Sequence, residues 1–275
     1  MALKKFVDKI VVVTGGAKGI GKNIARAFGL EGAFVFICDK DKNKGKETAL
    51  GLFSQGIAVE YLQVDLSQPT TPQKMIKTVV NRKKRVDILI NNVRSGKRVS
   101  FFHESLSNWE QCFAVSLRAA FFASQEAIKI MSNKEGLRIV NITSVAADLV
   151  CDESPSYHMA KAGMLQMTRY LAVKAGSSNI RVNAVSPGFI VQDEHRQRYE
   201  AICNENYRRK ARFCHPVGRI GNPDDIAKAV LFLCSPDSDF ITGQCFTIDG
   251  GLTIQEPSGL IIQFDKKFKK GRGGR

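Results

Sequence analysis

Short runs of apolar, largely β-branched residues recur along this chain, and segments of helical character separate them. The runs that we predict to be strands are Ile10–Thr14, Ala33–Cys38, Ile57–Val64, Val86–Ile90, Arg138–Thr143, Ile180–Val185 and Cys245–Ile248. The segments that we predict to be helices are Ile20–Leu30, Lys42–Phe53, Gln73–Arg82, Asn108–Met131, Ser156–Ala175 and Asp224–Cys234. Buried strands that alternate with helices are typical of parallel sheets. The sequence therefore predicts an α/β fold, a doubly wound parallel sheet with helices on both faces.

The alternation runs to Gly251 without an internal repeat or a low-complexity linker, which predicts one domain over residues 1–251. Two segments stand out from it. Residues 189–216 are polar and arginine-rich, and long insertions beyond the carboxyl end of a strand tend to cover the ligand in such sheets. We expect this segment to cover the substrate. Residues 252–275 form a basic C-terminal extension.

Positive charge is the one unusual bulk property, since the formal net charge is +15. Part of the excess lies in the last eleven residues, which hold six Lys and Arg against Asp265. The basic residues of this end are Lys266, Lys267, Lys269, Lys270, Arg272 and Arg275. A glycine-rich basic end is more typical of a disordered, solvated segment than of a nucleic-acid-binding arm. We therefore do not expect nucleic acid as a partner, although that alternative remains open for the tail.

Membrane and metal sites are not indicated. No apolar run approaches the ~20 residues that span a bilayer, and the start at Met1 shows no signal peptide. The seven cysteines include no C-x-x-C pair, and the four histidines lack metal-ligand spacing. We expect reduced thiols, no metal, no membrane partner and a cytoplasmic location.

A glycine-rich turn, TGGAKGIG at residues 14–21, joins the first predicted strand to the first helix. Glycines allow a tight turn and let a pyrophosphate approach backbone N–H groups at the start of the helix. Glycine in a turn is weak evidence alone, but here Asp39 also ends the second strand, as a Rossmann-type dinucleotide site requires. The turn residues expected to bind cofactor are Thr14, Gly15, Lys18, Gly19, Ile20 and Gly21.

Asp39 bears on the choice of cofactor. A carboxylate at this place accepts hydrogen bonds from ribose hydroxyls and repels a 2′-phosphate, which favours NAD over NADP. Lys18, Lys40 and Lys42 could offset the charge of such a phosphate. NADP therefore stays open.

Tyr157 and Lys161 are four residues apart in a predicted helix, so both side chains lie on one face. An adjacent ammonium is expected to lower the pKa of the Tyr157 phenol, which would then exchange a proton with an alcohol or carbonyl oxygen. Ser144 follows a predicted strand at the edge where ligands bind, and its hydroxyl is placed to hold that oxygen. The Tyr-x-x-x-Lys spacing alone occurs by chance in many helices.

Taken together, these features resemble the short-chain dehydrogenase/reductase family from about Lys9 to Gly251. The landmarks are TGGAKGIG at 14–21, Asp39, VDLS at 64–67, NN at 91–92, NITS at 141–144, YHMAK at 157–161, NAVSPGFI at 183–190, GRIGNPDDIA at 218–227 and ITGQCFTIDGG at 241–251. The C-terminal landmarks are similar in 3-oxoacyl-carrier-protein reductases and in sugar dehydrogenases, so they do not separate these two groups.

The resemblance implies roles for several residues. Ser144 would position the carbonyl, Tyr157 would be the acid/base, and Lys161 would bind the nicotinamide ribose and tune Tyr157. The remaining residues implied to contact the cofactor are Asp65, Leu66 and Asn91 on the adenine side, and Pro187, Gly188 and Ile190 along the nicotinamide. A homotetramer or dimer is implied as well. The leading hypothesis is hydride transfer between a nicotinamide and a secondary alcohol or ketone.

Three departures from the family pattern affect the predicted site. Ser116 stands where the family carries an asparagine that binds a water in a proton relay, and its hydroxyl would alternatively bond the carbonyl four residues back. Arg94 replaces the glycine of an N-N-A-G run, which places bulk and charge at the cofactor edge. Gln192 replaces a threonine. Ser116 and Arg94 support a rival hypothesis, a non-catalytic or weakly active nicotinamide-binding regulator or scaffold.

Basic residues on two segments predict an anionic substrate such as a carboxylate, a phosphate or an acidic carrier protein. Those after the fourth strand are Arg94, Lys97, Arg98 and His103, and those of the 189–216 segment are Arg196, Arg198, Arg208, Arg209, Lys210 and Arg212. The alternative is a helix with a solvated charged face.

Overall fold

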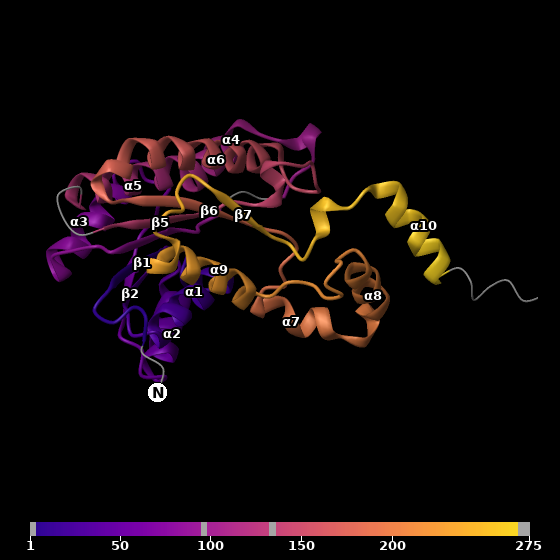
Figure 1. Ribbon diagram of the computed structural model, residues 1–275, viewed down its shortest axis with the longest axis horizontal. Coiled ribbons are helices and arrows are strands. Elements are labelled where there is room, and N and C mark those ends of the chain that lie inside the picture. The colour runs from indigo at the N-terminus through magenta and orange to yellow at the C-terminus, as the bar shows by residue number, and fades with distance from the viewer. Residues whose placement is uncertain (1–3, 95–97, 132–135, 269–275) are drawn as a thin grey trace, which may run out of the picture.

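A parallel sheet of seven strands forms the centre of the computed structural model, which describes residues 4–94, 98–131 and 136–268 (Figure 1). The strands are β1 (Ile10–Thr14), β2 (Phe34–Asp39), β3 (Val59–Gln63), β4 (Ile88–Asn91), β5 (Arg138–Ile142), β6 (Arg181–Pro187) and β7 (Cys245–Ile248). Their order is β3-β2-β1-β4-β5-β6-β7. Successive strands therefore extend outward in one direction as far as β3 and then in the other from β4, which confirms the predicted doubly wound sheet.

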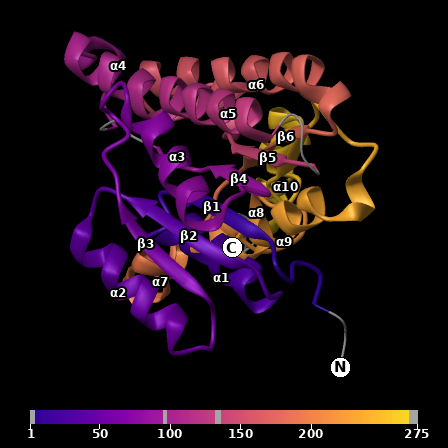
Figure 2. The same ribbon diagram turned by 90° about the vertical axis from the view of Figure 1, so that its left-hand side faces the viewer.

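Helices cover both faces of the sheet (Figures 1 and 2). One face carries α1 (Gly19–Leu30), α2 (Lys42–Phe53) and α9 (Pro223–Cys234). The other face carries α3 (Thr71–Lys83), α4 (Leu106–Phe113), α5 (Ala119–Met131) and α6 (Pro155–Ala175). The order in which strands are added to the sheet reverses between β1 and β4, which are parallel neighbours. The carboxyl ends of these two strands therefore form the crevice in which such sheets bind ligands.

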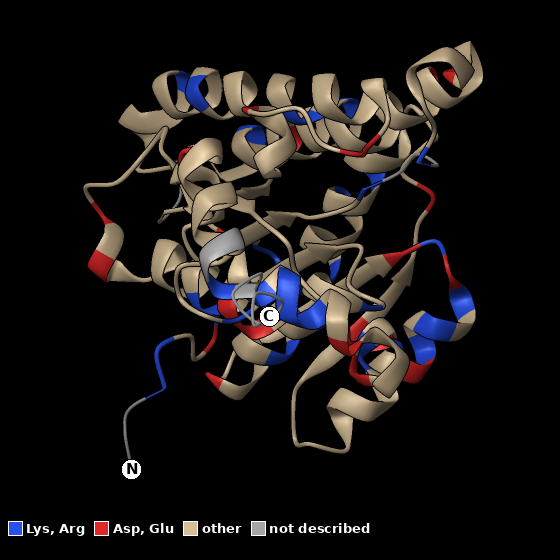
Figure 3. Ribbon diagram, turned by 90° about the vertical axis from the view of Figure 1, so that its right-hand side faces the viewer, with Lys and Arg blue, Asp and Glu red and all other residues tan. Residues whose placement is uncertain are grey.

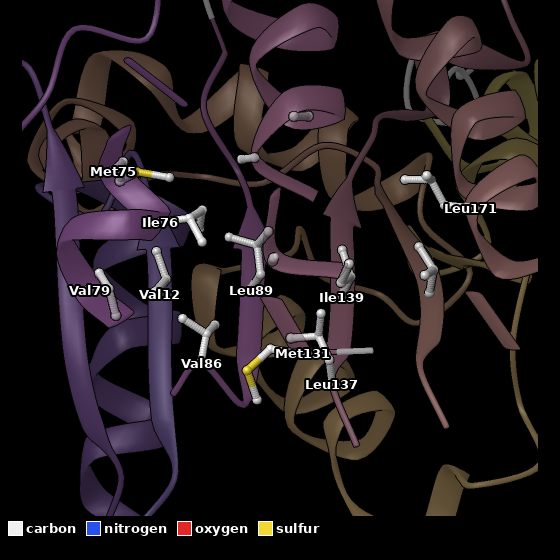
Figure 4. Close-up of a cluster of buried hydrophobic side chains, with 14 of the residues drawn as sticks. Val12, Met75, Ile76, Val79, Val86, Leu89, Met131, Leu137, Ile139 and Leu171 are labelled. Atoms are coloured by element: carbon white, nitrogen blue, oxygen red, sulfur yellow. The ribbon is translucent and has the colours of Figure 1, made fainter. Parts of the chain in front are cut away.

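Each strand supplies apolar side chains to two cores, since successive residues point to opposite faces. Val12 packs with Met75 and Ile76 of α3 on one face, as Figure 4 shows, while Val11 and Val13 belong to the core beneath α1 and α9. Burial on both faces explains why the strands are continuously apolar in sequence.

The predicted helix over Asn108–Met131 is interrupted, which corrects the expected single helix. A π-helical turn, Ala114–Arg118, separates α4 from α5 and contains Ser116. Hydrophobic periodicity does not reveal one inserted residue in a helix, and such π-turns are frequent at functional sites.

The 189–216 segment forms two short helices, α7 (Asp193–Glu200) and α8 (Glu205–Phe213). The Arg208 guanidinium joins them, since it donates to the carbonyls of Tyr199 at 2.7 Å and Ala201 at 2.6 Å. These carbonyls lie at the end of α7, where backbone acceptors lack helical partners.

The C-terminal extension contains a further helix, α10 (Pro257–Phe268). The expected disorder from Asp265 onward is therefore wrong for residues 265–268, while Lys269, Lys270, Arg272 and Arg275 lie outside the described residues. Glu256 accepts from the Ser258 N–H at 2.9 Å and so caps the start of the helix, and Phe264 packs edge-on against Phe213 at 5.4 Å. None of the helices in residues 4–268 that the structure describes has the length and apolar character to cross a bilayer.

Candidate active site

The glycine turn between β1 and α1 is tight enough to exclude side chains. Gly15 and Gly19 have φ of +64° and +55°, in the left-handed region that favours glycine. A Cβ on Gly21 would lie 2.2 Å from the carbonyl oxygen of Gly15. The turn therefore brings backbone N–H groups to the start of α1 with no Cβ in the way.

Thr14 and Asn92 hold this turn against the end of β4. The Thr14 hydroxyl donates to the Ile90 carbonyl at 3.1 Å and accepts from the Asn92 N–H at 2.9 Å. The Asn92 side-chain amide donates to the carbonyls of Thr14 at 3.0 Å and Gly15 at 3.2 Å. The role of Asn92 was not predicted from the sequence, although the paired asparagines at 91–92 were the available signal.

An oxygen acceptor already lies at the N-terminus of α1. The Gln192 Oε1 accepts from the Ile20 N–H at 3.0 Å, and the Asp193 carboxylate accepts from the Asn23 side chain at 2.8 Å. Both residues come from the start of the 189–216 segment. The Ile20 N–H, which a pyrophosphate oxygen would use, thus donates to a side-chain oxygen in this structure. Because it can bind an oxygen here, the turn fits a dinucleotide phosphate.

Asp39 lies beside the turn at the end of β2. Its carboxylate accepts from the N–H of Ala17 at 3.3 Å and of Asp41 at 3.0 Å. The ammonium-bearing side chains of Lys18, Lys40 and Lys42 are all exposed near this end of the sheet. A carboxylate fixed in this way is placed for ribose hydroxyls, with exposed cations nearby.

The residues expected on the adenine side occupy different environments. Asp65 is exposed, and its carboxylate has a lowered pKa because it accepts from Ser67, with desolvation opposing. Leu66 is buried in the core. The Asn91 side chain is also buried and donates to Ser124 at 3.0 Å and Asn141 at 2.8 Å. Its amide nitrogen therefore anchors β4 to its neighbours rather than pointing to the surface.

The residues expected along the nicotinamide lie at the end of β6. The Gly188 N–H donates to the Ile248 carbonyl at 3.1 Å, and a Cβ on Gly188 would lie 2.5 Å from that of Asp249. Pro187 ends β6, and Ile190 forms an isolated bridge with Gly221. This group shares the carboxyl edge of the sheet with the glycine turn.

Ser144, Tyr157 and Lys161 come together beyond the end of β5. Ser144 starts a 3₁₀ turn after the strand, where its hydroxyl accepts from the Ala146 N–H at 3.2 Å and acts on the pKa of the Tyr157 phenol on α6. The Lys161 ammonium lies 5.7 Å from the centre of the Tyr157 ring and donates to the Ile142 carbonyl at 2.7 Å. Tyr157 and Lys161 are buried, with only 7% and 1% of their surface exposed.

The expectation that Lys161 lowers the pKa of Tyr157 is wrong for this structure. Burial raises the pKa of the Tyr157 phenol, and the charge of Arg94 and the hydrogen bond from Ser144 oppose that rise. Burial also lowers the pKa of Lys161 to about 7, with a further contribution from Arg94. A buried ammonium loses its hydration, so Lys161 is a weaker source of positive charge than the spacing suggested.

Arg94 supplies the nearest well-defined positive charge to the phenol. Its guanidinium carbon lies 4.7 Å from the centre of the Tyr157 ring. Glu153 accepts from Arg94 at 3.2 Å and from Arg98 at 2.6 Å. We name these three residues the Arg94 cluster. No role was predicted for Glu153 from the sequence, because nothing in the local sequence distinguishes it from other carboxylates.

Ser116 lies behind the other three residues rather than among them. It is fully buried in the π-turn, and its hydroxyl lies 4.0 Å from the sulfur of Cys112. The Ser116 hydroxyl does not form the alternative hydrogen bond to the Cys112 carbonyl four residues back. Ser116 also lines a cavity of about 10 Å³ together with Thr14, Leu66 and Asn91. A cavity of this size is at the lower limit for one water molecule.

The predicted basic mouth is only partly formed. Arg208 binds carbonyls within its own segment, Arg196 lies 3.8 Å from Asp193, and the His103 ring bonds the Ser100 hydroxyl at 2.7 Å. Figure 3 shows Lys and Arg mixed with Asp and Glu on α7 and α8. Lys97 lies outside the described residues. Within the described ranges, no group of three or more His, Cys, Asp and Glu has the geometry of a metal site.

Comparisons with known proteins cover almost the whole chain. The family model described as enoyl-(acyl carrier protein) reductase matches residues 15–253. The chain is 31% identical over 248 residues to a 3-oxoacyl-[acyl-carrier-protein] reductase from Chlamydia pneumoniae, covering 90% of this chain and 98% of that protein. It is 30% identical over 271 residues to a 7alpha-hydroxysteroid dehydrogenase from Bacteroides fragilis, covering 94% and 100%.

A solved structure is similar over the same range. It is a protein from Sinorhizobium meliloti 1021 described as a short-chain alcohol dehydrogenase, with a TM-score of 0.83 at 28% identity. The superposition covers 93% of this chain and 100% of that one. The sequence and structure comparisons thus both cover more than nine tenths of the solved or curated protein.

Proposed function

The chain belongs to the short-chain dehydrogenase/reductase family, and we propose that it interconverts a secondary alcohol and a ketone by hydride transfer with a nicotinamide cofactor. It is an NAD(P)-dependent oxidoreductase of that family, acting on CH–OH groups. The observation that carries the specific reaction is the meeting of Tyr157, Ser144 and Lys161 at the sheet edge that also holds the glycine turn.

Each of the three side chains has a distinct role in the proposed reduction. When bound, the cofactor supplies the hydride. Tyr157 donates its proton to the carbonyl oxygen, and its raised pKa keeps the phenol protonated at neutral pH. The Ser144 hydroxyl holds the same oxygen in position, because it lies close enough to the phenol to act on its pKa. Lys161 holds the ribose, with its ammonium presented from beneath the end of β5.

Turnover of ketones or secondary alcohols with NADH or NAD tests this function. We would assay β-ketoacyl thioesters, oxo acids, sugar acids and steroids against both cofactors. Turnover in any of these classes supports the proposal, and cofactor binding without turnover in every class contradicts it.

We propose NAD(H) as the preferred cofactor, on the position of Asp39 beside the turn. Wild-type protein should bind NADH at least about tenfold more tightly than NADPH, because Asp39 repels the 2′-phosphate. D39N retains much of the local hydrogen bonding and should narrow this ratio, as measured by the fluorescence of the bound dihydronicotinamide. A wild-type preference for NADPH would show that Lys18, Lys40 and Lys42 outweigh the carboxylate.

Gln192 is expected to weaken cofactor binding in the native protein. Its amide oxygen occupies the Ile20 N–H that a pyrophosphate would use, so binding must first break this hydrogen bond. Q192A should tighten NADH binding about two- to tenfold, the range of one ordinary hydrogen bond. Q55A, at an exposed glutamine that bonds Arg26 instead, is the matched control and should leave the affinity unchanged. Weaker binding by Q192A would mean that Gln192 contacts the cofactor directly.

A nicotinamide-binding protein without turnover is the second candidate function. One observation favours it, the fully buried Ser116 in place of a relay asparagine. The same substrate panel separates the two candidates.

We propose domain boundaries and an assembly as well. Residues 1–251 would form the cofactor-binding and catalytic domain, residues 189–216 its substrate cover, and residues 252–275 an extension. Val173 on α6 and Phe240 before β7 are strongly exposed apolar side chains, which supports a homo-oligomer, a tetramer or dimer. A monomer in light scattering would contradict this.

Seven free cysteines support a reducing, cytoplasmic location, which fractionation of cells would test.

A further inference from the structure

Arg94 lies over the ring of Tyr157, and we propose that the Arg94 cluster recognises a carboxylate on the substrate. The substrate would then be a short oxo acid or the matching hydroxy acid. This inference rests on the proposed function and narrows its substrate class. Arg94 binds the carboxylate, Arg98 supports it, and Glu153 holds both arginines in place until the substrate arrives.

The exposure of the three side chains supports this arrangement. Half of the Arg94 side chain and 61% of the Arg98 side chain are exposed, whereas only 11% of the Glu153 side chain is. The carboxylate is therefore packed behind the two guanidinium groups, and the guanidinium groups face the solvent. A guanidinium has five N–H donors and pairs with carboxylates in a planar, two-bond geometry.

Within the described residues, other titratable groups also act on the cluster. Asp152 and Cys151 are the further groups that act on Arg98, and Glu153 is held in its charged form because the hydrogen bond and charges of the two arginines outweigh its burial. A substrate carboxylate would take over the Arg94 guanidinium from Glu153, which keeps its bond to Arg98. The substrate carboxylate must therefore compete with Glu153 for the Arg94 guanidinium.

The position of Arg94 limits the length of the substrate. Its guanidinium lies over the ring of the same tyrosine that protonates the carbonyl oxygen, 4.7 Å from the ring centre. A carboxylate on Arg94 is therefore separated from that carbonyl by no more than a few bonds. This favours 2-oxo and 3-oxo acids over acids with a distant carboxylate.

Two aromatic side chains near Arg98 favour an apolar remainder on such an acid. Tyr207 of α8 packs edge-on against Phe189 at 6.3 Å, and the charge of Arg98 acts on the Tyr207 phenol. Both aromatic rings are substantially exposed. The arginines of the same segment are weaker candidates for the carboxylate, since Arg208 is held by carbonyls and Arg196 lies near Asp193.

The test compares each acid with its neutral amide, using 2-oxobutanoate with 2-oxobutanamide and 3-oxobutanoate with 3-oxobutanamide. Wild-type protein with NADH should prefer at least one acid by about tenfold or more in kcat/KM, the value of one charge-assisted pair. R94Q should bring this ratio close to one, mainly through KM. E153Q should act in the opposite direction and lower KM for the acid, because Arg94 then has no internal partner. R26Q, at an exposed arginine on α1, should leave the ratio unchanged.

Binding separates failure of this inference from failure of the proposed function. Calorimetry with butanoate and the NADH complex requires no turnover, and we expect binding to the wild type that R94Q and R98Q weaken while circular dichroism stays native. If neither acid nor amide reacts but butanoate binds through Arg94, the carboxylate site stands and the reaction is wrong. Equal kcat/KM for acids and amides, or butanoate binding that R94Q does not weaken, overturns the inference.

Discussion

Replacing Tyr157 with phenylalanine is expected to reduce kcat by about 10²- to 10⁴-fold, the usual contribution of a positioned acid or base. The phenol is buried, and the centre of its ring lies 4.7 Å from the Arg94 guanidinium and 5.7 Å from the Lys161 ammonium. Phenylalanine retains the ring and its packing and removes only the proton donor. The measurement is kcat of Y157F with the best ketone found for the wild type, together with its affinity for NADH.

The control for this variant is Tyr170, which lies on the same helix with half of its surface exposed. Y170F should leave both kcat and NADH affinity unchanged. If Y157F retained the wild-type kcat, Tyr157 would not be the acid, and the proposed mechanism would be wrong even if the enzyme class were right.

Replacing Lys161 with methionine is expected to change how stability depends on pH. Burial depresses the pKa of the folded-state amine from 10.5 to about 7, so the unfolded chain binds a proton between these values that the folded protein has released. The contribution of Lys161 to the free energy of unfolding of the wild type therefore increases as the pH rises between these two pKa values. K161M lacks this increase in the free energy of unfolding. Between pH 7 and pH 9 the wild type should gain about 2 kcal/mol relative to K161M.

Urea unfolding of both proteins without cofactor, at these two pH values, measures this difference directly. Using the difference cancels the titration of every group that the two proteins share. The exposed Lys174, on the same helix, provides a control, since K174M should follow the wild type at both pH values. A constant difference between wild type and K161M would mean that Lys161 keeps an ordinary pKa despite its burial.

The sequence predicted the sheet well because burial on both faces leaves a clear pattern. Lys42–Phe53 and Cys245–Ile248 agree with the observed α2 and β7 at both ends. The π-turn was missed because one extra residue in a helix hardly changes hydrophobic periodicity. The C-terminal helix was missed in part because its first turn depends on capping by Glu256 and on contact with Phe213.

The sequence predicted which three side chains would lie near one another, but not their electrostatics. Spacing placed Tyr157 and Lys161 on one face, and the structure brings Ser144 to them. Spacing carried no information on burial, which raises the pKa of the phenol and lowers that of the amine. The role of Glu153 depends on Arg94 and Arg98, which lie more than fifty residues earlier in the chain, so no local pattern could reveal it.

The measurement that tests the central claim most directly follows the hydride itself. Wild-type protein would be incubated with NADH deuterated on both hydrogens at C4 of the nicotinamide and with the panel of carbonyl compounds, and the products would be analysed by mass spectrometry. We predict deuterium on the carbinol carbon of at least one product alcohol, and its loss in Y157F. NADH binding with no deuterated alcohol from any member of the panel would contradict the account and favour a nicotinamide-binding protein without turnover.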